Sequence, residues 1–465
     1  MHQFEPIRVG LDALPLGTSG VRIRDYNGLA VARALHDILA VSADSNSVSG
    51  GILDSWECDE RGTKHFLKVQ HGLHWSDGST LDARHVVRGL NHAIDRSLVS
   101  NKAIAAAFWW KGRRSLLTVR DNYHIELTTP RAHRLLGHLL TLPQLSPIAD
   151  NANCWSGPYV PRQPDSLNLI INGQSRLWQE SSPLKLKFVV ARANDSLSVG
   201  SEFMVDLTAN TALSRSEWIE FSVRENAVVS DTAILGVLIP GPRLSGPHNV
   251  DLRRAISLSI DRGGLAQTMN NMIHPAWRPR SLFDVSIDPN IPSADQHVAR
   301  NLWSTAKGME VDLLFANFAP NPEIATILVD QISQSLGQKV RARQVSWESY
   351  LSQLSHRSFD LAYALLPSQY LHPASILSTF RSDIREEGNQ LSDTFGDLCN
   401  AMDASANTSD IDAAEHFWLE QLPLIPICQT RSLYLYGPRL GRPLPDKHGL
   451  ISYDTLKSGA TSWGV

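Results

Sequence analysis

Residues Phe66–Asp95 read FLKVQHGLHWSDGSTLDARHVVRGLNHAID and predict a strand, a turn and a helix in direct succession. Apolar and polar side chains alternate over Phe66–Gln70, as in a strand with one buried face. Asp77 and Gly78 supply the residues of a turn, and Asp82 is a suitable N-cap for the helix that follows. The apolar side chains of that helix recur at helical spacing at Val86, Val87, Leu90 and Ala93. We expect the helix to end at the close of the quoted stretch.

Strands and helices alternate along the rest of the chain, which is typical of α/β lobes. In the first half we expect strands at Ile7–Leu11, 120–130, Leu167–Ile171 and Leu184–Val190, and an amphipathic helix that starts at Asp251 and ends at Asp261-Arg262. In the second half we expect strands at Met309–Ala316, Val340–Val345, Asp360–Leu366 and Leu424–Cys428, and helices at Pro322–Leu336, Trp347–Leu354 and Ile411–Leu422.

The length of 465 residues predicts more than one domain, since a domain takes roughly 100–200 residues. We expect a first lobe over 1–260 that includes a β-rich subdomain at about 160–235, a second lobe over 261–430, and a return to the first lobe over 431–465. The stretch Pro275–Pro292 is rich in Pro and Asp, which favours a surface crossing between the lobes.

The composition is that of an ordinary globular protein. Hydrophobic residues make up 42% and charged residues 19% of the chain, and the formal net charge is −4. No block of Lys and Arg stands out, so we expect no direct binding to nucleic acid. The apolar stretches Ala103–Trp110 and Thr232–Pro240 are much shorter than the roughly 18 residues of a membrane-spanning helix, and we expect no membrane span.

The amino terminus, MHQFEPIRVGLDALP, lacks the basic start, the apolar region and the cleavage site of a secretory signal peptide. Two interpretations stay open. Either a signal peptide was removed before Met1 and the protein is periplasmic or extracytoplasmic, or the natural protein stays in the cytoplasm.

The cysteines and histidines do not predict a metal site. Cys58, Cys154, Cys399 and Cys428 form no C-x-x-C pair, which argues against zinc-ribbon and thioredoxin-type sites. Cys399 and Cys428 flank a predicted helix and can pair in an oxidising compartment, but four separate thiols are favoured. The chain also has no P-loop, Rossmann G-x-G-x-x-G, G-x-S-x-G or H-E-x-x-H pattern. We therefore expect no catalytic residues, no metal and no cofactor.

Four segments of the chain resemble one known family. They are the quoted stretch Phe66–Asp95, the turn Ser156–Tyr159, the helix Asp251–Arg262 (DLRRAISLSIDR) and the segment Leu422–Ile427. Together they resemble the extracellular solute-binding proteins of family 5, which include oligopeptide, dipeptide and nickel receptors. The resemblance implies a two-lobe, class II periplasmic-binding-protein-like α/β fold of the oligopeptide-receptor type with an extra β-rich subdomain.

The resemblance also points to ligand-binding residues. In peptide-binding members a loop of the form W-x-A-D-Y-x-D-P follows a strand of the second lobe, and its aspartate pairs with the ligand's α-ammonium group. The stretch FDLAYALLPSQYLHPASILSTF at Phe359–Phe380 aligns with that loop without a gap. Leu366 stands at the position of the tryptophan, Gln369 and His372 stand at those of the two acids, and Tyr370 is kept.

The residue expected to pair with the ligand's carboxylate also differs. In dipeptide receptors an arginine after the strand of the preceding βαβ unit pairs with the ligand's carboxylate, and here the turn ANFAPNP offers Asn317. Burying both charged ends of a peptide without partners costs roughly several kcal/mol at each end. Gln369 and Asn317 instead suit a neutral, hydrogen-bonding ligand. His372 adds a pH-sensitive or anionic contact, or is a surface-loop histidine.

An aromatic cluster supplies further candidates. Trp109 and Trp110 precede Lys111 and can line a ligand cleft by stacking, although a packed loop is the alternative.

Three functions fit these residues. The favoured one is a bacterial receptor that captures a small polar or peptide-like solute between two lobes and delivers it to an ABC permease. The second is a cytoplasmic ligand-sensing module, similar to the carboxyl-terminal part of sugar-phosphate-stress transcription regulators, which also lack the D-Y-x-D-P acids. The least favoured is a biosynthetic enzyme that uses the same cleft. We expect a monomer, with permease subunits as its protein partners.

Overall fold

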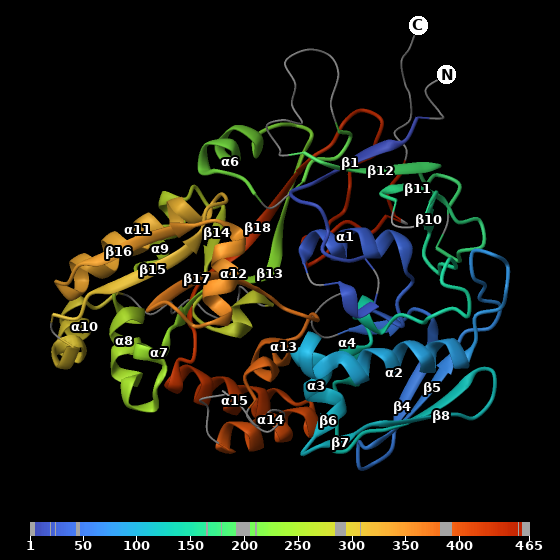
Figure 1. Cartoon of the computed structure of the whole chain (residues 1–465), viewed down its shortest axis with the longest axis horizontal. Helices are drawn as coiled ribbons and strands as arrows, with labels where there is room; N and C mark the ends of the chain where they lie inside the picture. The colour runs from blue at the N-terminus through green and yellow to red at the C-terminus, as the bar shows by residue number, and fades with distance from the viewer. Residues whose placement is uncertain are drawn as a thin grey trace, which may run out of the picture.

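The structure is a computed structural model of the whole chain (Figure 1). It describes every residue except 1–4, 19, 24, 43–46, 164–165, 178, 192–204, 210–211, 284–293, 307, 382–392, 454 and 458–465. The predicted crossing at Pro275–Pro292 therefore lies partly outside the described residues.

The quoted stretch lies in a sheet with the strand order β4-β5-β9-β8, named here the outer sheet, whose inner face packs against helices. The elements are β4 (Leu53–Cys58), β5 (Lys64–Val69), β8 (Leu116–Val119), β9 (His124–Thr128), α2 (Ala83–Ser100), α3 (Lys102–Phe108) and α4 (Leu136–Leu139). Asp82 caps α2 by accepting the N–H of Arg84 at 2.9 Å, so the predicted strand, turn and helix are confirmed. α2 continues past its expected end to Ser100, and Asn101 then begins α3.

A second sheet, the terminal sheet, has the strand order β1-β12-β11-β10 and lies beside α1 (Figure 1). Its elements are β1 (Ile7–Leu11), β10 (Tyr159–Pro161), β11 (Asn168–Ile171), β12 (Lys185–Val190) and α1 (Tyr26–Leu35). Side chains from the last part of the chain share its core: Leu440, Leu450, Ile451, Tyr453 and Leu456.

The third sheet, the large sheet, has the strand order β14-β18-β13-β17-β15-β16. Its strands are β13 (Ala227–Pro240), β14 (Ile273–Pro275), β15 (Val311–Ala316), β16 (Val340–Val345), β17 (Leu361–Pro367) and β18 (Ile425–Leu435). β15 is parallel to β16 and β17, whereas β13 is antiparallel to β17 and β18.

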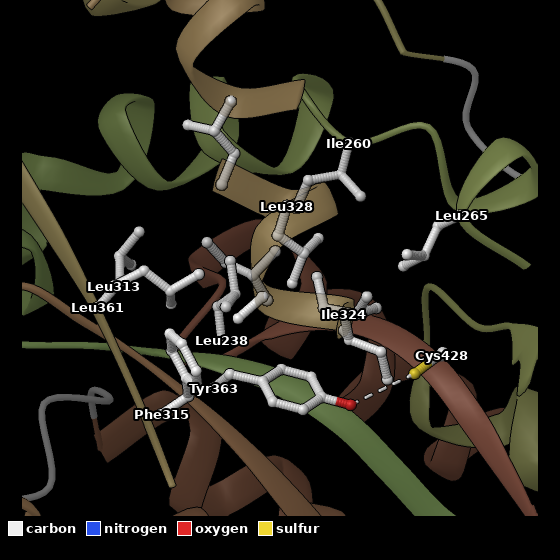
Figure 2. Packing of buried hydrophobic residues seen from close by; sticks show 14 of the residues in the cluster. Leu238, Ile260, Leu265, Leu313, Phe315, Ile324, Leu328, Leu361, Tyr363 and Cys428 are labelled. Carbon is white, nitrogen blue, oxygen red and sulfur yellow. Dashed lines mark hydrogen bonds between the residues drawn. The ribbon is translucent and has the colours of Figure 1, made fainter. Parts of the chain in front are cut away.

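Neighbouring residues of its strands point to opposite faces, and each face has its own core. Figure 2 shows Leu313, Phe315 and Tyr363 on one face beneath Leu328 of a covering helix. The helices of this face are α8 (Val250–Leu258), α9 (Arg262–Thr268), α10 (Gln296–Trp303) and α11 (Asn321–Leu336). The other face carries α12 (Trp347–Ser355), α13 (Ala374–Leu377), α14 (Asp393–Ser405) and α15 (Thr408–Gln421).

β13 and β18 are long enough to take part in two cores. At one end Leu238 and Ile425 lie in the core of the large sheet, and at the other Val228 and Tyr434 lie in the core of the terminal sheet. Their pairing register shifts between Asp231 and Leu235. The two strands therefore connect the halves of the molecule, as Figure 1 shows.

The division into lobes predicted from the sequence stays a prediction, and the strand pairing favours an earlier first boundary. β13 begins at Ala227 and is a central strand of the large sheet, so the predicted boundary at 260 falls among helices that pack on this sheet. Periodicity identified the helices but could not reveal which sheet they would cover, because that depends on pairing between distant strands.

Two further predictions, on one helix end and on the cysteines, can be compared with the structure. The helix predicted to run from Asp251 to Asp261-Arg262 ends earlier, since α8 ends at Leu258. A separate helix follows, because the Asp261 side chain accepts the N–H of Gly264 at 2.9 Å to start α9 at Arg262. All four cysteines are thiols, which agrees with the favoured interpretation. Cys399 and Cys428 belong to cores on opposite faces of the large sheet and do not pair.

Candidate functional site

The candidate site is built on the loop Ser368–Pro373, which follows β17 and leads into α13. β15 and β17 are parallel neighbours, so the turn at Asn317 and this loop leave the same edge of the large sheet. In open α/β sheets, ligands bind outside the carboxyl ends of the strands. Asn317 is exposed and its N–H donates to the Val345 carbonyl at 2.9 Å.

Hydrogen bonds within the molecule fix the backbone of this loop. The buried Ser375 hydroxyl accepts the N–H of Gln369 at 2.8 Å, and the Ser368 N–H donates to the Ala233 carbonyl at 2.8 Å. The loop is therefore attached to α13 on one side and to β13 on the other.

Two side chains of the loop reach into the half of the molecule that holds the outer sheet. Tyr370 is 2% exposed and packs in the same core as α2 and α3. The ring of His372 lies against that of His138, with centroids 4.7 Å apart. Figure 1 shows α13 beside α3 and α4. The loop is thus a contact between the two halves.

Gln369 is half-buried and pairs with the other half through a side-chain amide. The Nδ2 of Asn101 donates to Gln369 Oε1 at 3.1 Å. Asn101 is also the N-cap of α3, where its Oδ1 accepts the N–H of Ile104 at 3.1 Å. A neutral, oriented amide pair therefore lies where the loop meets the other half of the molecule.

His372 does not behave as the sequence suggested. It is 8% exposed, its Nδ1 accepts the N–H of Ala374, and burial lowers its pKa to about 3, with a smaller contribution from His138. The alternative of a surface-loop histidine is wrong, because the ring is buried, whereas a contact between His372 and a ligand stays a prediction.

Leu366 and the two tryptophans take up packing positions. Leu366 is half-buried against the core that faces α14 and α15. Trp109 donates its indole N–H to the Ile94 carbonyl at 2.9 Å, and Trp110 lies under the Lys111 ammonium, 5.0 Å from its ring centroid. Both tryptophans follow the far end of α3 from Asn101, a helix about 10 Å long. Trp109 packs against the same core as Tyr370 of the loop, whereas Trp110 is not among the residues of that core.

A buried ionic cluster near the loop was not found from the sequence. Asp403 of α14 binds Arg381 at 2.6 Å and Arg131, which follows β9, at 2.7 Å. Burial opposes the charge on Asp403, but Arg131, His133 and Arg381 outweigh it and hold its pKa below the usual value. The partners Arg131 and Asp403 are 272 residues apart, so no local pattern could have indicated the pair.

A small open cavity of about 110 Å³ lies elsewhere, where the terminal sheet meets the outer sheet. Arg176 at its edge is paired with the buried Asp37 at 2.6 Å. The lining residues include Leu73, His74 and Gln174. The guanidinium of Arg176 is already neutralised by Asp37, so it offers no free charge to a ligand in the cavity.

Other kinds of site find no support in the part of the chain that the structure describes. The described residues contain no group of three or more His, Cys, Asp or Glu side chains able to hold a metal ion. None of the described helices is both long and apolar enough to cross a bilayer.

Comparison with known proteins identifies relatives of the whole arrangement. The family model of the bacterial extracellular solute-binding proteins, family 5, matches residues 47–387. The periplasmic oligopeptide-binding protein OppA of Salmonella typhimurium is 22% identical over 412 residues, which cover 76% of this chain and 73% of OppA. The periplasmic murein peptide-binding protein MppA of Escherichia coli is 24% identical over 213 residues, which cover 42% of this chain and 40% of MppA.

Solved structures confirm the predicted fold class. The murein tripeptide-binding protein MppA of Escherichia coli has a TM-score of 0.79 at 16% identity, over 97% of this chain and 98% of that chain. The complex of Haemophilus influenzae OppA with the peptide RPPGFSPFR has a TM-score of 0.78 at 15% identity, with the same coverage. The protein AgaA of A. tumefaciens R10, bound to agropinic acid, has a TM-score of 0.77 at 16% identity, over 98% of this chain and 99% of that chain. The fold therefore holds peptides in some proteins and a different kind of ligand in another.

Proposed function

The chain belongs to the bacterial extracellular solute-binding proteins of family 5, and we propose that it captures a small polar or peptide-like ligand that lacks a free α-ammonium group at Gln369. The family consists of receptors of ABC transporters, not of enzymes. The observation that supports the narrower proposal is the neutral Asn101–Gln369 amide pair, at the position where the resemblance to peptide-binding members implies an aspartate.

Physical chemistry favours such a ligand. An ammonium group that enters a partly buried site loses hydration, which only an acid or several acceptors can offset. Gln369 offers a single uncharged carboxamide oxygen, which is turned toward Asn101 and accepts a hydrogen bond from it. Asn317, at the same sheet edge, likewise offers an uncharged amide where a ligand carboxylate would need a cation. A zwitterionic dipeptide therefore finds neither of its charged partners at these two positions.

We propose transport as the setting, since the curated relatives are periplasmic proteins. On this proposal the ligand is held between two lobes, the closed form docks on permease subunits, and the receptor is a monomer. The alternative, a cytoplasmic sensing module, predicts that the same ligand changes the affinity for a regulatory partner instead of a permease.

The proposal is tested by native mass spectrometry of gently purified protein, followed by calorimetric titration. We expect the retained ligand to lack a free α-ammonium group, and we expect wild-type protein to bind free di- and tripeptides weakly. Gln369→Asp should raise the affinity for peptides with a free amino terminus, whereas the neutral control Gln369→Asn should not. Tight binding of ordinary free peptides by the wild type would contradict the proposal.

A further inference from the structure

The orientation of the Gln369 carboxamide follows from a chain of hydrogen bonds that begins in α3. The backbone N–H of Ile104 is only a donor, so the Asn101 atom that meets it at 3.1 Å must be the carboxamide oxygen. The amide of Asn101 is thereby fixed, although oxygen and nitrogen of an isolated carboxamide are hard to tell apart.

The next bond carries this orientation into the candidate site. With its oxygen on Ile104, Asn101 can turn only its Nδ2 donor toward Gln369, 3.1 Å away. The Gln369 atom facing it must accept and is therefore Oε1, which leaves Nε2 as the other end of the carboxamide. Among the residues that the structure describes, none accepts a hydrogen bond from Gln369 Nε2 at hydrogen-bonding distance.

We propose that Asn101 is a positioning residue that makes position 369 a hydrogen-bond donor to the ligand. The inference rests on the proposed function and narrows it: the ligand presents an acceptor, such as a carbonyl, hydroxyl or carboxylate oxygen, to Gln369 Nε2. An ammonium group placed against Nε2 would face its two N–H groups, so that donors meet donors. Both groups then lose hydration without gaining a hydrogen bond, which disfavours an ammonium group at this point.

The scaffold supports this role because neither amide can turn without breaking another bond. Rotating Asn101 removes the cap of α3, and rotating Gln369 alone places two donors against each other. The backbone of Gln369 is held independently by Ser375, so the loop does not depend on the amide pair for its position.

The test is a pair of substitutions at position 101. Asn101→Asp keeps the cap, since Asp is as good an N-cap as Asn, but offers only acceptors. Gln369 must then turn its Nε2 toward residue 101 and present Oε1 outward. The control Asn101→Ser keeps a cap but has no donor that reaches Gln369, so the carboxamide becomes free to turn.

Calorimetry with two probes measures the selectivity. The probes are Ala-Ala-Ala and N-acetyl-Ala-Ala-Ala, which differ at the amino terminus. We expect the wild type to favour the acetylated probe by about tenfold, Asn101→Ser to lose the preference, and Asn101→Asp to reverse it. Asn101→Asp combined with Gln369→Met controls for simple attraction by the new charge. A reversal that persists in the double variant, or a preference that no substitution at 101 changes, overturns the inference.

A measurement without ligand keeps the inference separable from the proposed function. In protein labelled with ¹⁵N at Asn and Gln side chains, the amide protons of Asn101 should exchange slowly and those of Gln369 fast. In Asn101→Asp the protons of Gln369 should become slow. Protected Gln369 protons in the wild type would overturn the inference even if a ligand binds. Failure of both probes to bind, with the expected exchange pattern, would count against a peptide-like ligand and leave Asn101 as the residue that orients Gln369.

Discussion

The molecule buries arginines in two different ways. Arg253 and Arg262, beside the large sheet, bind main-chain carbonyls: Arg253 reaches Leu244 at 2.7 Å, and Arg262 reaches Pro426 at 2.8 Å. Arg131 and Arg381, near the candidate site, instead share the carboxylate of Asp403. All four side chains are almost fully enclosed, yet only the second pair has a counter-ion.

Arg253 and Arg262 form permanent attachments within one half, whereas Arg131 and Asp403 form a contact between the halves that can separate. Carbonyls are fixed in the backbone, so Arg253 and Arg262 join α8 and α9 to neighbouring segments of one half. With no carboxylate beside them, burial lowers the pKa of each guanidinium to about 10, which still leaves both charged at neutral pH. Arg131 and Asp403 come from different halves. If the halves separate, water can hydrate both ions, and the contact can form again.

The largest effect on stability is expected when the shared carboxylate of Asp403 is removed. Asp403→Asn leaves two buried cations without a counter-ion, and we expect the free energy of unfolding to fall by about 3–5 kcal/mol. Urea unfolding measures the loss. The control is Glu220→Gln in the exposed pair of Glu220 with Arg224, where we expect a loss below about 0.5 kcal/mol. Equal losses for both variants would mean that the cluster contributes no more than a surface pair.

Acid should weaken the junction through His133, which lies beside the Asp403 cluster. Burial lowers its pKa from 6.5 to about 4. Between pH 6.5 and pH 4, His133 is therefore protonated in the unfolded chain but not in the folded protein. Stability therefore falls as pH drops from 6.5 to 4, by about 3 kcal/mol from this residue. His133→Gln should reduce the pH dependence of unfolding by that amount. The exposed His416 provides the control, and an unchanged slope in His133→Gln would contradict the prediction.

Replacing a buried arginine that has no carboxylate partner should cost less. Arg262→Met leaves the Pro426 carbonyl without this donor but strands no opposite charge, and we expect a loss of about 2 kcal/mol in the free energy of unfolding. Denaturant titration at low and high salt checks this. A loss larger than that of Asp403→Asn would reverse the ranking of the two kinds of site.

Replacing Gln369, the residue proposed to select the ligand, is expected to have the smallest effect on stability. Gln369 is half-buried and its amide bond to Asn101 joins two neutral groups. Gln369→Met should therefore lower the free energy of unfolding by less than about 1 kcal/mol, while it removes the donor proposed to meet the ligand. Thermal unfolding and ligand titration of the same variant separate the two effects. A large loss of stability would show that the pair mainly holds the halves together.

The sequence was informative where structure depends on neighbours along the chain. Asp82, Gly337 and the periodic apolar residues predicted the start of α2 and the limits of α11, β15, β16 and β17 to within a few residues, because caps and periodicity act locally. The central strand β13 and the short β14 were not predicted. Leu424–Cys428 was too short a prediction for β18. This strand continues to Leu435 into a second core, and which core a strand enters is decided by distant partners.

The site shows the same limit. The resemblance to the family indicated Gln369, but its partner Asn101 lies 268 residues away, and no sequence pattern singled it out. His372 looked accessible because loop histidines usually are. It is buried against the tilted ring of His138, a distant residue that no local pattern indicates.

The register shift of β13 has a mechanical consequence. Where the ladder with β18 is interrupted, Ala233 turns its hydrogen bonds to loops instead: its N–H donates to Lys447 and its carbonyl accepts from Ser368, the residue before Gln369. A break of this kind bends a strand and increases its local twist. The bend of β13 is tied through Ser368 to the loop that carries Gln369, so the shape of the central strand helps to set the position of that loop.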